Sequence, residues 1–337
     1  MPVHAVARDQ GERPPRLMSL PPRRRSPSPI AYAVSAALLA VLGCAGLSQP
    51  QTDESPRHAP GQGLTLWQGL VLGVTEGLTE YLPVSSTGHL CLVERMLGIG
   101  LTEGEKPAAD AYAIAIQLGA ILAVLWLYWG RVVLALKGVI GRSPEGRRLA
   151  VNLLVAFLPA AAAGLLLEPL IKRYLFGLWP ITAAWLVGGL AILLGSRWWG
   201  GEAAERLDLA QLRPVQALAV GVAQVFAMWP GVSRSLATIV GGLAVGLSAP
   251  AAVEFSFLLG LVTLGAATTK EIVSSGGLMV ATFGYVAPLV GLLAALVSAA
   301  AAVKWMVGYV TKHGLAAFGY YRVGLAVWVG VWLLLAR

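Results

Sequence analysis

Charged residues are scarce in this chain. Only 12% of its 337 residues are Asp, Glu, Lys or Arg, whereas a soluble domain has about 25%. Its two cysteines, Cys44 and Cys91, provide neither a disulfide framework nor a zinc-binding pattern. A glycine-rich nucleotide-binding loop of the Walker type is also missing. These absences exclude an ordinary soluble domain, a disulfide-rich secreted protein and a P-loop enzyme.

Hydrophobic residues, by contrast, make up 57% of the chain and gather in long runs. A helix needs about twenty residues to cross a hydrocarbon core of about 30 Å. Runs near this length lie at 111–129, 149–168, 178–196, 251–268, 283–303 and 318–336. The sequence therefore predicts an all-α polytopic membrane protein with about six full transmembrane helices. The net charge of +8 does not indicate nucleic acid binding, because much of it lies in the N-terminal tail and beside the runs, where basic residues set topology.

The first 63 residues divide into three segments. Residues 1–29 are rich in proline and arginine, so we expect a disordered basic tail. The run over 30–48 is interpreted as a signal sequence or an extra anchor helix, and 49–63 as a linker. Cleavage before Cys44, as in a lipoprotein, and a true start at Met18 are alternatives. A membrane domain over 64–337 follows, with repeat halves at about 64–199 and 214–337.

A short polar segment over residues 76–89, called the first polar island below, interrupts an apolar stretch that is too long for one span. As a single helix, residues 64–97 would reach about 51 Å. Pro83 lies in the middle, where it removes a backbone donor and breaks the helix. Broken backbone at membrane depth persists only where protein or a water-filled cavity satisfies it. The segment therefore predicts two half-length helices in a re-entrant hairpin.

A second stretch, 214–247, repeats this pattern. At an offset of 148, Glu76 aligns with Gln224, Glu80 with Met228 and Ser85 with Ser233, and at an offset of 146 Gln117 aligns with Thr263. Paired broken segments in two halves indicate repeats that build a site near the membrane midplane. The basic residues over 131–148 predict a cytoplasmic loop. Counting spans from that loop makes the two hairpins enter from opposite faces, as an inverted-topology repeat requires.

The two islands carry the polar chemistry of the apolar region. The first holds Glu76, Glu80, Ser85, Ser86, Thr87 and His89, and the second holds Ser233, Arg234, Ser235 and Thr238. A helix that begins after a break presents unpaired N–H groups and the positive end of its dipole, where phosphate binds well. Hydroxyl groups add donors, and the planar guanidinium of Arg234 can hold two phosphate oxygens. The islands therefore predict one site for a phosphate-bearing ligand in a membrane.

Two mechanisms are open at this point. A serine activated by His89 or by a glutamate could attack phosphorus. Alternatively, Glu76 and Glu80, four residues apart on one helix face, could hold a divalent cation that bridges phosphates. Hydroxyl residues in membrane helices also bond their own backbone or a neighbouring helix. The charges of Lys270, Glu271 and Arg322 lie near span ends and are interpreted as snorkelling or interfacial.

The islands resemble the two signature motifs of a known enzyme family. Residues 76–89 (EGLTEYLPVSSTGH) and 230–235 (PGVSRS) are similar to the motifs of the bacterial undecaprenyl-diphosphate phosphatases, the bacitracin-resistance family. The similarity runs from about residue 64 to the C-terminus and includes Gln117-Leu118-Gly119, Glu254 to Leu259 and Tyr320-Tyr321-Arg322. It implies a hydrolase of the bacterial inner membrane that removes the terminal phosphate of the C55 lipid diphosphate on the periplasmic or exterior side. This reaction recycles the carrier for peptidoglycan synthesis and confers bacitracin resistance.

The resemblance also implies roles for individual residues. Ser86 would be the nucleophile, His89 its acid/base partner and Arg234 the phosphate clamp. Glu76 and Glu80 would be the acidic pair and would hold a divalent cation, Mg²⁺ or Ca²⁺. The implied substrate-binding residues are Ser85, Thr87, Ser233, Ser235 and Thr238. Expected partners are a polyprenyl diphosphate and membrane lipid, with a homodimer as the alternative to a monomer.

Three departures and one competing function accompany the resemblance, and one departure is that the first sixty residues have no counterpart in the family. Leu236 stands where the family usually has glycine, and Ala113 where a glutamate often precedes the Gln-Leu-Gly stretch. These positions bear on rate or metal use rather than on the class of reaction. The competing function is a lipid-phosphate transporter or flippase, because inverted repeats with broken helices are a common transporter architecture.

Overall fold

The computed structural model describes residues 63–199 and 206–335, and every structural statement below concerns that part of the chain. The predicted tail, the signal or anchor run and nearly all of the linker lie outside it. Its helices, in chain order, are α2 (Leu66–Thr79), α3 (Ser86–Leu97), α4 (Lys106–Ala115), α5 (Gln117–Leu127), α6 (Trp129–Val139), α7 (Pro144–Leu175), α8 (Leu178–Trp199), α9 (Pro214–Val225), α10 (Arg234–Ala244), α11 (Ala249–Phe283), α12 (Val286–His313) and α13 (Ala316–Leu335). Two short 3₁₀ turns, η1 (Leu209–Gln211) and η2 (Phe226–Met228), flank α9.

Within the described residues, six helical segments are long and apolar enough to cross a membrane. They are α4 with α5 (Lys106–Leu127), α7, α8 (as Leu178–Ser196), α11, α12 and α13. The all-α polytopic fold and its span count are therefore confirmed. The helices extend beyond the apolar runs, since α7 begins at Pro144 and α11 continues to Phe283. The predicted loop over 131–148 is itself partly helical, because α6 folds back on α7 where Gly138 contacts Gly146.

Both predicted breaks are present, and each lies in the turn of an antiparallel helix pair. Helix α2 ends at Thr79, before Pro83, and α3 begins at Ser86. The Gln68 side chain at the start of α2 donates to the carbonyl of Leu97 at the end of α3, at 3.5 Å. In the second pair, Gln216 donates to the carbonyl of Val245 at 2.9 Å. These bonds differ by 148 residues at both ends, so the repeat found in the sequence is a repeat of structure.

The serines that precede α3 and α10 show the same correspondence. Ser85 has φ of 75° and Ser233 has φ of 80°, and they are the non-glycine residues with positive φ in the described chain. Such backbone costs about 1–3 kcal/mol and persists only where its surroundings hold it. The weaker match, Gln117 with Thr263, is not accompanied by a shared break, because α4 and α5 divide at Ile116 whereas α11 is continuous.

Each half packs its first helix along a helix of the other half. Helix α2 runs parallel to α12, because Gly69, Gly73 and Gly77 contact Ala287, Gly291 and Ala295 in turn. An added Cβ at any of these glycines would meet α12 backbone. Helix α9 runs parallel to α7, since Asn152 donates to the carbonyl of Leu212 at 2.8 Å and Gly221 contacts Ala156 further along.

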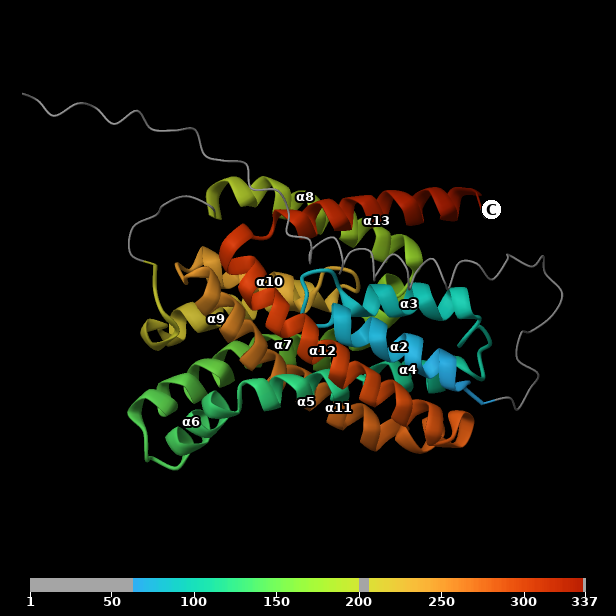
Figure 1. Ribbon diagram of the computed structural model, residues 1–337, viewed down its shortest axis with the longest axis horizontal. Coiled ribbons are helices and arrows are strands. Elements are labelled where there is room, and N and C mark those ends of the chain that lie inside the picture. The colour runs from blue at the N-terminus through green and yellow to red at the C-terminus, as the bar shows by residue number, and fades with distance from the viewer. Residues whose placement is uncertain (1–62, 200–205, 336–337) are drawn as a thin grey trace, which may run out of the picture.

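These pairs establish the inverted orientation. Helices α7 and α11 run the same way, because Arg131 bridges Glu145 and Glu254 near their starts, while Glu168 pairs with Lys270 further along. Helix α12 returns against α11 after a short turn (Figure 1). Because α2 runs parallel to α12 and α9 runs parallel to α7, the α2–α3 pair and the α9–α10 pair point in opposite directions. Helices α8 and α13 pack together along one side of the bundle (Figure 1).

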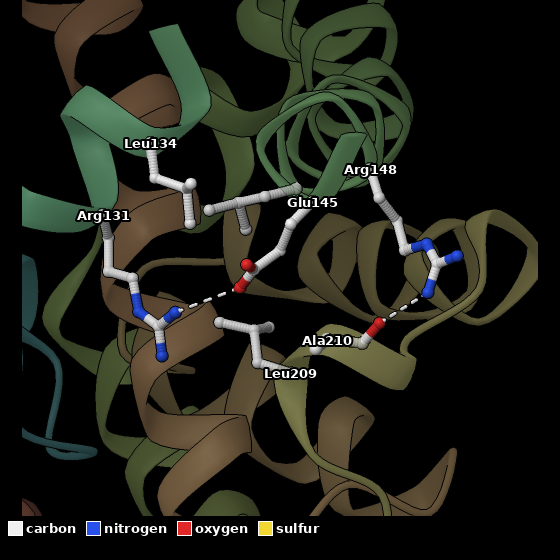
Figure 2. Close-up of a pocket in the computed structure, with 7 residues that line it drawn as sticks. Arg131, Leu134, Glu145, Arg148, Leu209 and Ala210 are labelled. Carbon is white, nitrogen blue, oxygen red and sulfur yellow. Dashed lines mark hydrogen bonds and ion pairs between the residues drawn. The ribbon is translucent and has the colours of Figure 1, made fainter. Parts of the chain in front are cut away.

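A small pocket lies between α6, the start of α7 and the η1 turn, and its lining includes Arg131 and Arg148 (Figure 2). Arg131 lies 2.6 Å from a carboxylate oxygen of Glu254 and 3.7 Å from one of Glu145, and Arg148 donates to the carbonyl of Ala210 at 2.8 Å. These cations already have partners, and no residue of the two polar islands lines the pocket. It is therefore separate from the candidate active site.

Candidate active site

The turns of the two helix breaks are hydrogen-bonded to each other. The N–H of Gly231 donates to the Ser85 hydroxyl at 3.2 Å. The Ser235 hydroxyl donates to the carbonyl of Leu82 at 2.8 Å. Residues 146 and 153 positions apart in the chain therefore meet, and the N-termini of α3 and α10 belong to one polar cluster.

Glu80 joins the first island to the second. The Ser86 hydroxyl donates a short hydrogen bond to Oε2 of Glu80. The other carboxylate oxygen, Oε1, lies 3.3 Å from Nη2 of Arg234. The Arg234 and Glu80 side chains are only 10% and 5% exposed, so solvent screens this pair poorly. A hydroxyl, a carboxylate and a fixed cation thus stand in one hydrogen-bonded line.

The guanidinium of Arg234 lies in a narrow slot. Nη1 donates to the carbonyl of Ser256 at 3.0 Å, and the Tyr81 ring centroid lies 5.4 Å from Cζ, a distance typical of cation–π contact. Gly260 lies against the same group: a Cβ added there would be 2.7 Å from Nη1 and 2.8 Å from Cζ. The slot therefore limits how the Arg234 guanidinium can be oriented.

Gly260→Ala is expected to lower turnover about 10- to 100-fold without unfolding the protein. The new methyl group pushes the end of a flexible side chain, so Arg234 moves rather than the helix, and a displacement near 1 Å can cost about 100-fold. Turnover and thermal melting of the purified variant measure this. Gly265→Ala on the same helix is the matched control, because nothing lies within 4 Å of its Cβ position. Equal activity of the two variants would contradict the slot.

Glu76 is fully buried, and neither of its carboxylate oxygens has a hydrogen-bond partner among the described residues. A buried ionised carboxylate without a partner is costly, so it needs a cation, a proton or a ligand. No group of three or more His, Cys, Asp or Glu residues capable of holding a metal occurs in the described chain. Mg²⁺ is, however, commonly held by one or two carboxylates plus substrate phosphates. Glu76 and Glu80 are therefore the residues that could hold a cation of that kind.

His89 contacts groups other than Ser86. Its Nδ1 lies 2.7 Å from the carbonyl of Ser85, and its Nε2 lies 2.8 Å from the Tyr321 hydroxyl. Because a carbonyl only accepts, we assign the proton of the neutral ring to Nδ1, which leaves Nε2 to accept from Tyr321. The expected hydrogen bond between His89 and Ser86 is therefore not formed here, and Glu80 stands in its place. His89 instead supports the strained backbone at Ser85.

The other predicted binding residues lie in or beside the two breaks. Ser233 accepts from the N–H of Leu236 at 3.2 Å, and its hydroxyl lies 3.0 Å from that of Ser235. Thr238 bonds the carbonyl of Arg234 at 2.9 Å and the Ser256 hydroxyl at 2.6 Å, while Thr87 is partly exposed. The hydroxyls of the second island thus brace the break, and their contact with substrate stays a prediction. Leu236 packs into the apolar core.

Sequence reasoning missed three residues that hold the site. Ser256 supplies the carbonyl that positions Arg234, and Trp185 donates from Nε1 to the carbonyl of Val84 at 3.0 Å. Arg322 is 0% exposed, so its interpretation as an interfacial charge was wrong. Helix α13 presents this side chain to Gly188 of α8 rather than to the surface. A charge inside an apolar run was the signal available in the sequence.

Comparison with known proteins assigns the chain to a described family. Residues 69–328 match the family model of the bacitracin resistance protein BacA. An undecaprenyl-diphosphatase of Sorangium cellulosum is 44% identical over 275 residues, covering 79% of this chain and 86% of the relative. An undecaprenyl-diphosphatase of Nitrosospira multiformis is 42% identical over 266 residues, covering 78% and 93% of the two chains. The family match includes both helix breaks and begins at residue 69.

Proposed function

The chain belongs to the bacitracin resistance protein BacA family, and on that premise we propose that its two joined helix breaks form the active site of an undecaprenyl-diphosphate phosphatase. The protein is a multi-pass membrane hydrolase that converts undecaprenyl diphosphate to undecaprenyl phosphate and inorganic phosphate. The observation that best supports this active site is the series of contacts from Ser86 through Glu80 to Arg234. It unites one residue of the second break with two of the first.

In the proposed reaction, the terminal phosphate lies against the N-termini of α3 and α10. Arg234 donates to its non-bridging oxygens, in competition with its present partner Glu80. The Ser86 oxygen attacks phosphorus while its proton passes to the Glu80 carboxylate, and the bridging P–O bond breaks to release undecaprenyl phosphate. Water then hydrolyses the phosphoserine, which restores Ser86 and yields inorganic phosphate. Fixed dipoles and one cation oppose the developing negative charge, usually the largest contribution to such catalysis.

We propose that Glu76 and Glu80 also hold a divalent cation, Mg²⁺ or Ca²⁺. When bound, the cation neutralises charge on the diphosphate. The support for this is the unpartnered Glu76 carboxylate beside Glu80.

The orientation in the membrane is likewise a proposal. The cations over 131–148 gather at one end of α7, and basic residues favour the cytoplasmic side. With that end of α7 on the cytoplasmic side of the bacterial inner membrane, the α2–α3 hairpin is re-entrant from the periplasmic or exterior side. Its catalytic groups then face that side. The α9–α10 hairpin enters from the cytoplasm. A homodimer stays a prediction, to be measured by light scattering of the purified protein.

A lipid-phosphate transporter is the second function considered. It would use the helix termini and Arg234, but it has no need of a serine hydroxyl bonded to a carboxylate. The relatives are also named as diphosphatases. Both considerations favour hydrolysis.

The test is release of inorganic phosphate from the C55 diphosphate by purified protein in detergent, with and without EDTA. EDTA is expected to lower the rate at least about 10-fold, because the charge on the phosphoryl group is no longer neutralised when the cation is removed. Added Mg²⁺ or Ca²⁺ should restore the rate. Full activity in EDTA would reject the cation. Failure of the folded protein to release phosphate would reject the phosphatase.

A further inference from the structure

Arg322 of α13 donates hydrogen bonds to backbone of both helix breaks. Nη1 lies 3.2 Å from the carbonyl of Pro83 and 3.1 Å from that of Val232. Nη2 lies 2.8 Å from the carbonyl of Gly231 and 2.9 Å from that of Ala184 in α8. A single side chain thus connects the first break, the second break and α8.

The charge of Arg322 has no carboxylate partner among the described residues; the four carbonyl groups are its recorded partners. A buried cation is expensive at membrane depth, so contact between α13 and α8 alone would favour an apolar side chain here. Backbone carbonyls in a broken helix are also left without their usual partners. One planar, permanently charged fork satisfies three such carbonyls from two breaks, which a smaller or uncharged side chain cannot do.

The carbonyls that Arg322 holds flank the strained serines. Pro83 lies two residues before Ser85, and Val232 immediately precedes Ser233. These serines have φ of 75° and 80° and stand at the N-termini of α3 and α10. The preceding residue, Tyr321, holds His89, which in turn contacts the carbonyl of Ser85. Consecutive residues of α13 therefore fasten the backbone on which the phosphate-binding groups stand.

We propose that Arg322 is a positioning residue for the reaction: its guanidinium fixes the two breaks relative to each other, so that the N-termini of α3 and α10 act on one phosphate. The expected effect on kcat rests on the proposed function, whereas the expected effect on the two breaks rests on the geometry alone. Gly188 completes the arrangement, because a Cβ at that position would run into Nη2 of Arg322.

The test uses two variants that disturb Arg322 in different ways. Arg322→Lys keeps a positive charge but replaces the fork with one ammonium, which cannot span the same carbonyls. Gly188→Ala keeps the arginine and crowds it. Gly324→Ala, on the same helix as Arg322, is the control, because nothing lies within 4 Å of its Cβ position. Each protein is purified in detergent, and its folded fraction is measured so that rates refer to folded molecules.

Two readouts are taken. Backbone amide hydrogen exchange is expected to accelerate at least about 10-fold at both breaks, 82–86 and 230–234, in Arg322→Lys and Gly188→Ala, with α5 unchanged, because local opening controls exchange. With undecaprenyl diphosphate, kcat is expected to fall about 100-fold in Arg322→Lys while KM changes less than about 3-fold, since misplacement affects the transition state more than binding.

The outcomes separate this inference from the proposed function. Unchanged exchange at either break, or a wild-type kcat per folded molecule in both variants, overturns the positioning role. Exchange that accelerates at both breaks in a protein whose parent releases no phosphate supports the positioning role and rejects the phosphatase. A loss of activity that only follows the loss of folded protein assigns Arg322 a structural role and overturns the proposal.

Discussion

Arg234→Ala is expected to lower kcat/KM for undecaprenyl diphosphate about 10³-fold or more, which corresponds to about 4 kcal/mol of transition-state stabilisation. Arg234 is the cation that contacts Glu80, and its guanidinium matches the geometry of phosphate oxygens. The low exposure of its side chain reduces solvent screening, so its charge is expected to act more strongly on a bound phosphate than that of an exposed arginine would. Phosphate release from the C55 lipid measures the loss.

An effect on folding must be separated from an effect on the reaction in this experiment, because alanine removes the guanidinium that pairs with the Glu80 carboxylate. Arg234→Lys is therefore measured beside it: the charge remains, the two-point contact is lost, and an intermediate rate is expected. Arg142→Ala is the matched control, since Arg142 is exposed on the turn between α6 and α7. Near-wild-type turnover by well-folded Arg234→Ala would remove the second break from the active site and require another phosphate clamp.

The helix breaks could be predicted because their cause is local. Pro83 cannot continue a helix, and the apolar stretch around it is too long for one span. The internal repeat then transferred the same reading to the second half, where no proline occupies the position equivalent to Pro83. Ser85 and Ser233 share a left-handed backbone that no propensity would assign to serine. Alignment of the halves identified the pair, whereas its strained conformation required the structure.

The contacts that support the site could not be predicted, because they join segments far apart in the chain. Arg322 lies 239 residues from Pro83 and donates to its carbonyl. Backbone carbonyls leave no trace in side-chain sequence, so no motif announces such an acceptor. The depth of Arg322 depends on the packing of α13 against α8, where Gly188 makes room for the guanidinium. The same reasoning applies to Ser256, whose contribution is its carbonyl rather than its hydroxyl.

Glu80→Gln is expected to reduce kcat about 10³-fold, because the amide can still accept the Ser86 hydrogen bond but cannot take its proton. General base catalysis contributes about 10²- to 10⁴-fold, and the variant also weakens the ion pair with Arg234. His89→Gln should cost less, about 10-fold, since His89 contacts the carbonyl of Ser85 rather than the Ser86 hydroxyl. Single-turnover phosphate release at saturating substrate compares the two variants.

Glu76→Gln distinguishes a base from a cation ligand at Glu80. Both glutamates are expected to hold the cation, so high Mg²⁺ should recover part of the activity lost in Glu76→Gln, by mass action on a weakened site. The activity lost in Glu80→Gln should stay low at every Mg²⁺ concentration, because added cation cannot replace a proton acceptor. Recovery of both variants would make Glu80 a cation ligand alone. A larger loss in His89→Gln than in Glu80→Gln would return the role of base to the histidine and require its ring to turn toward Ser86 during the reaction.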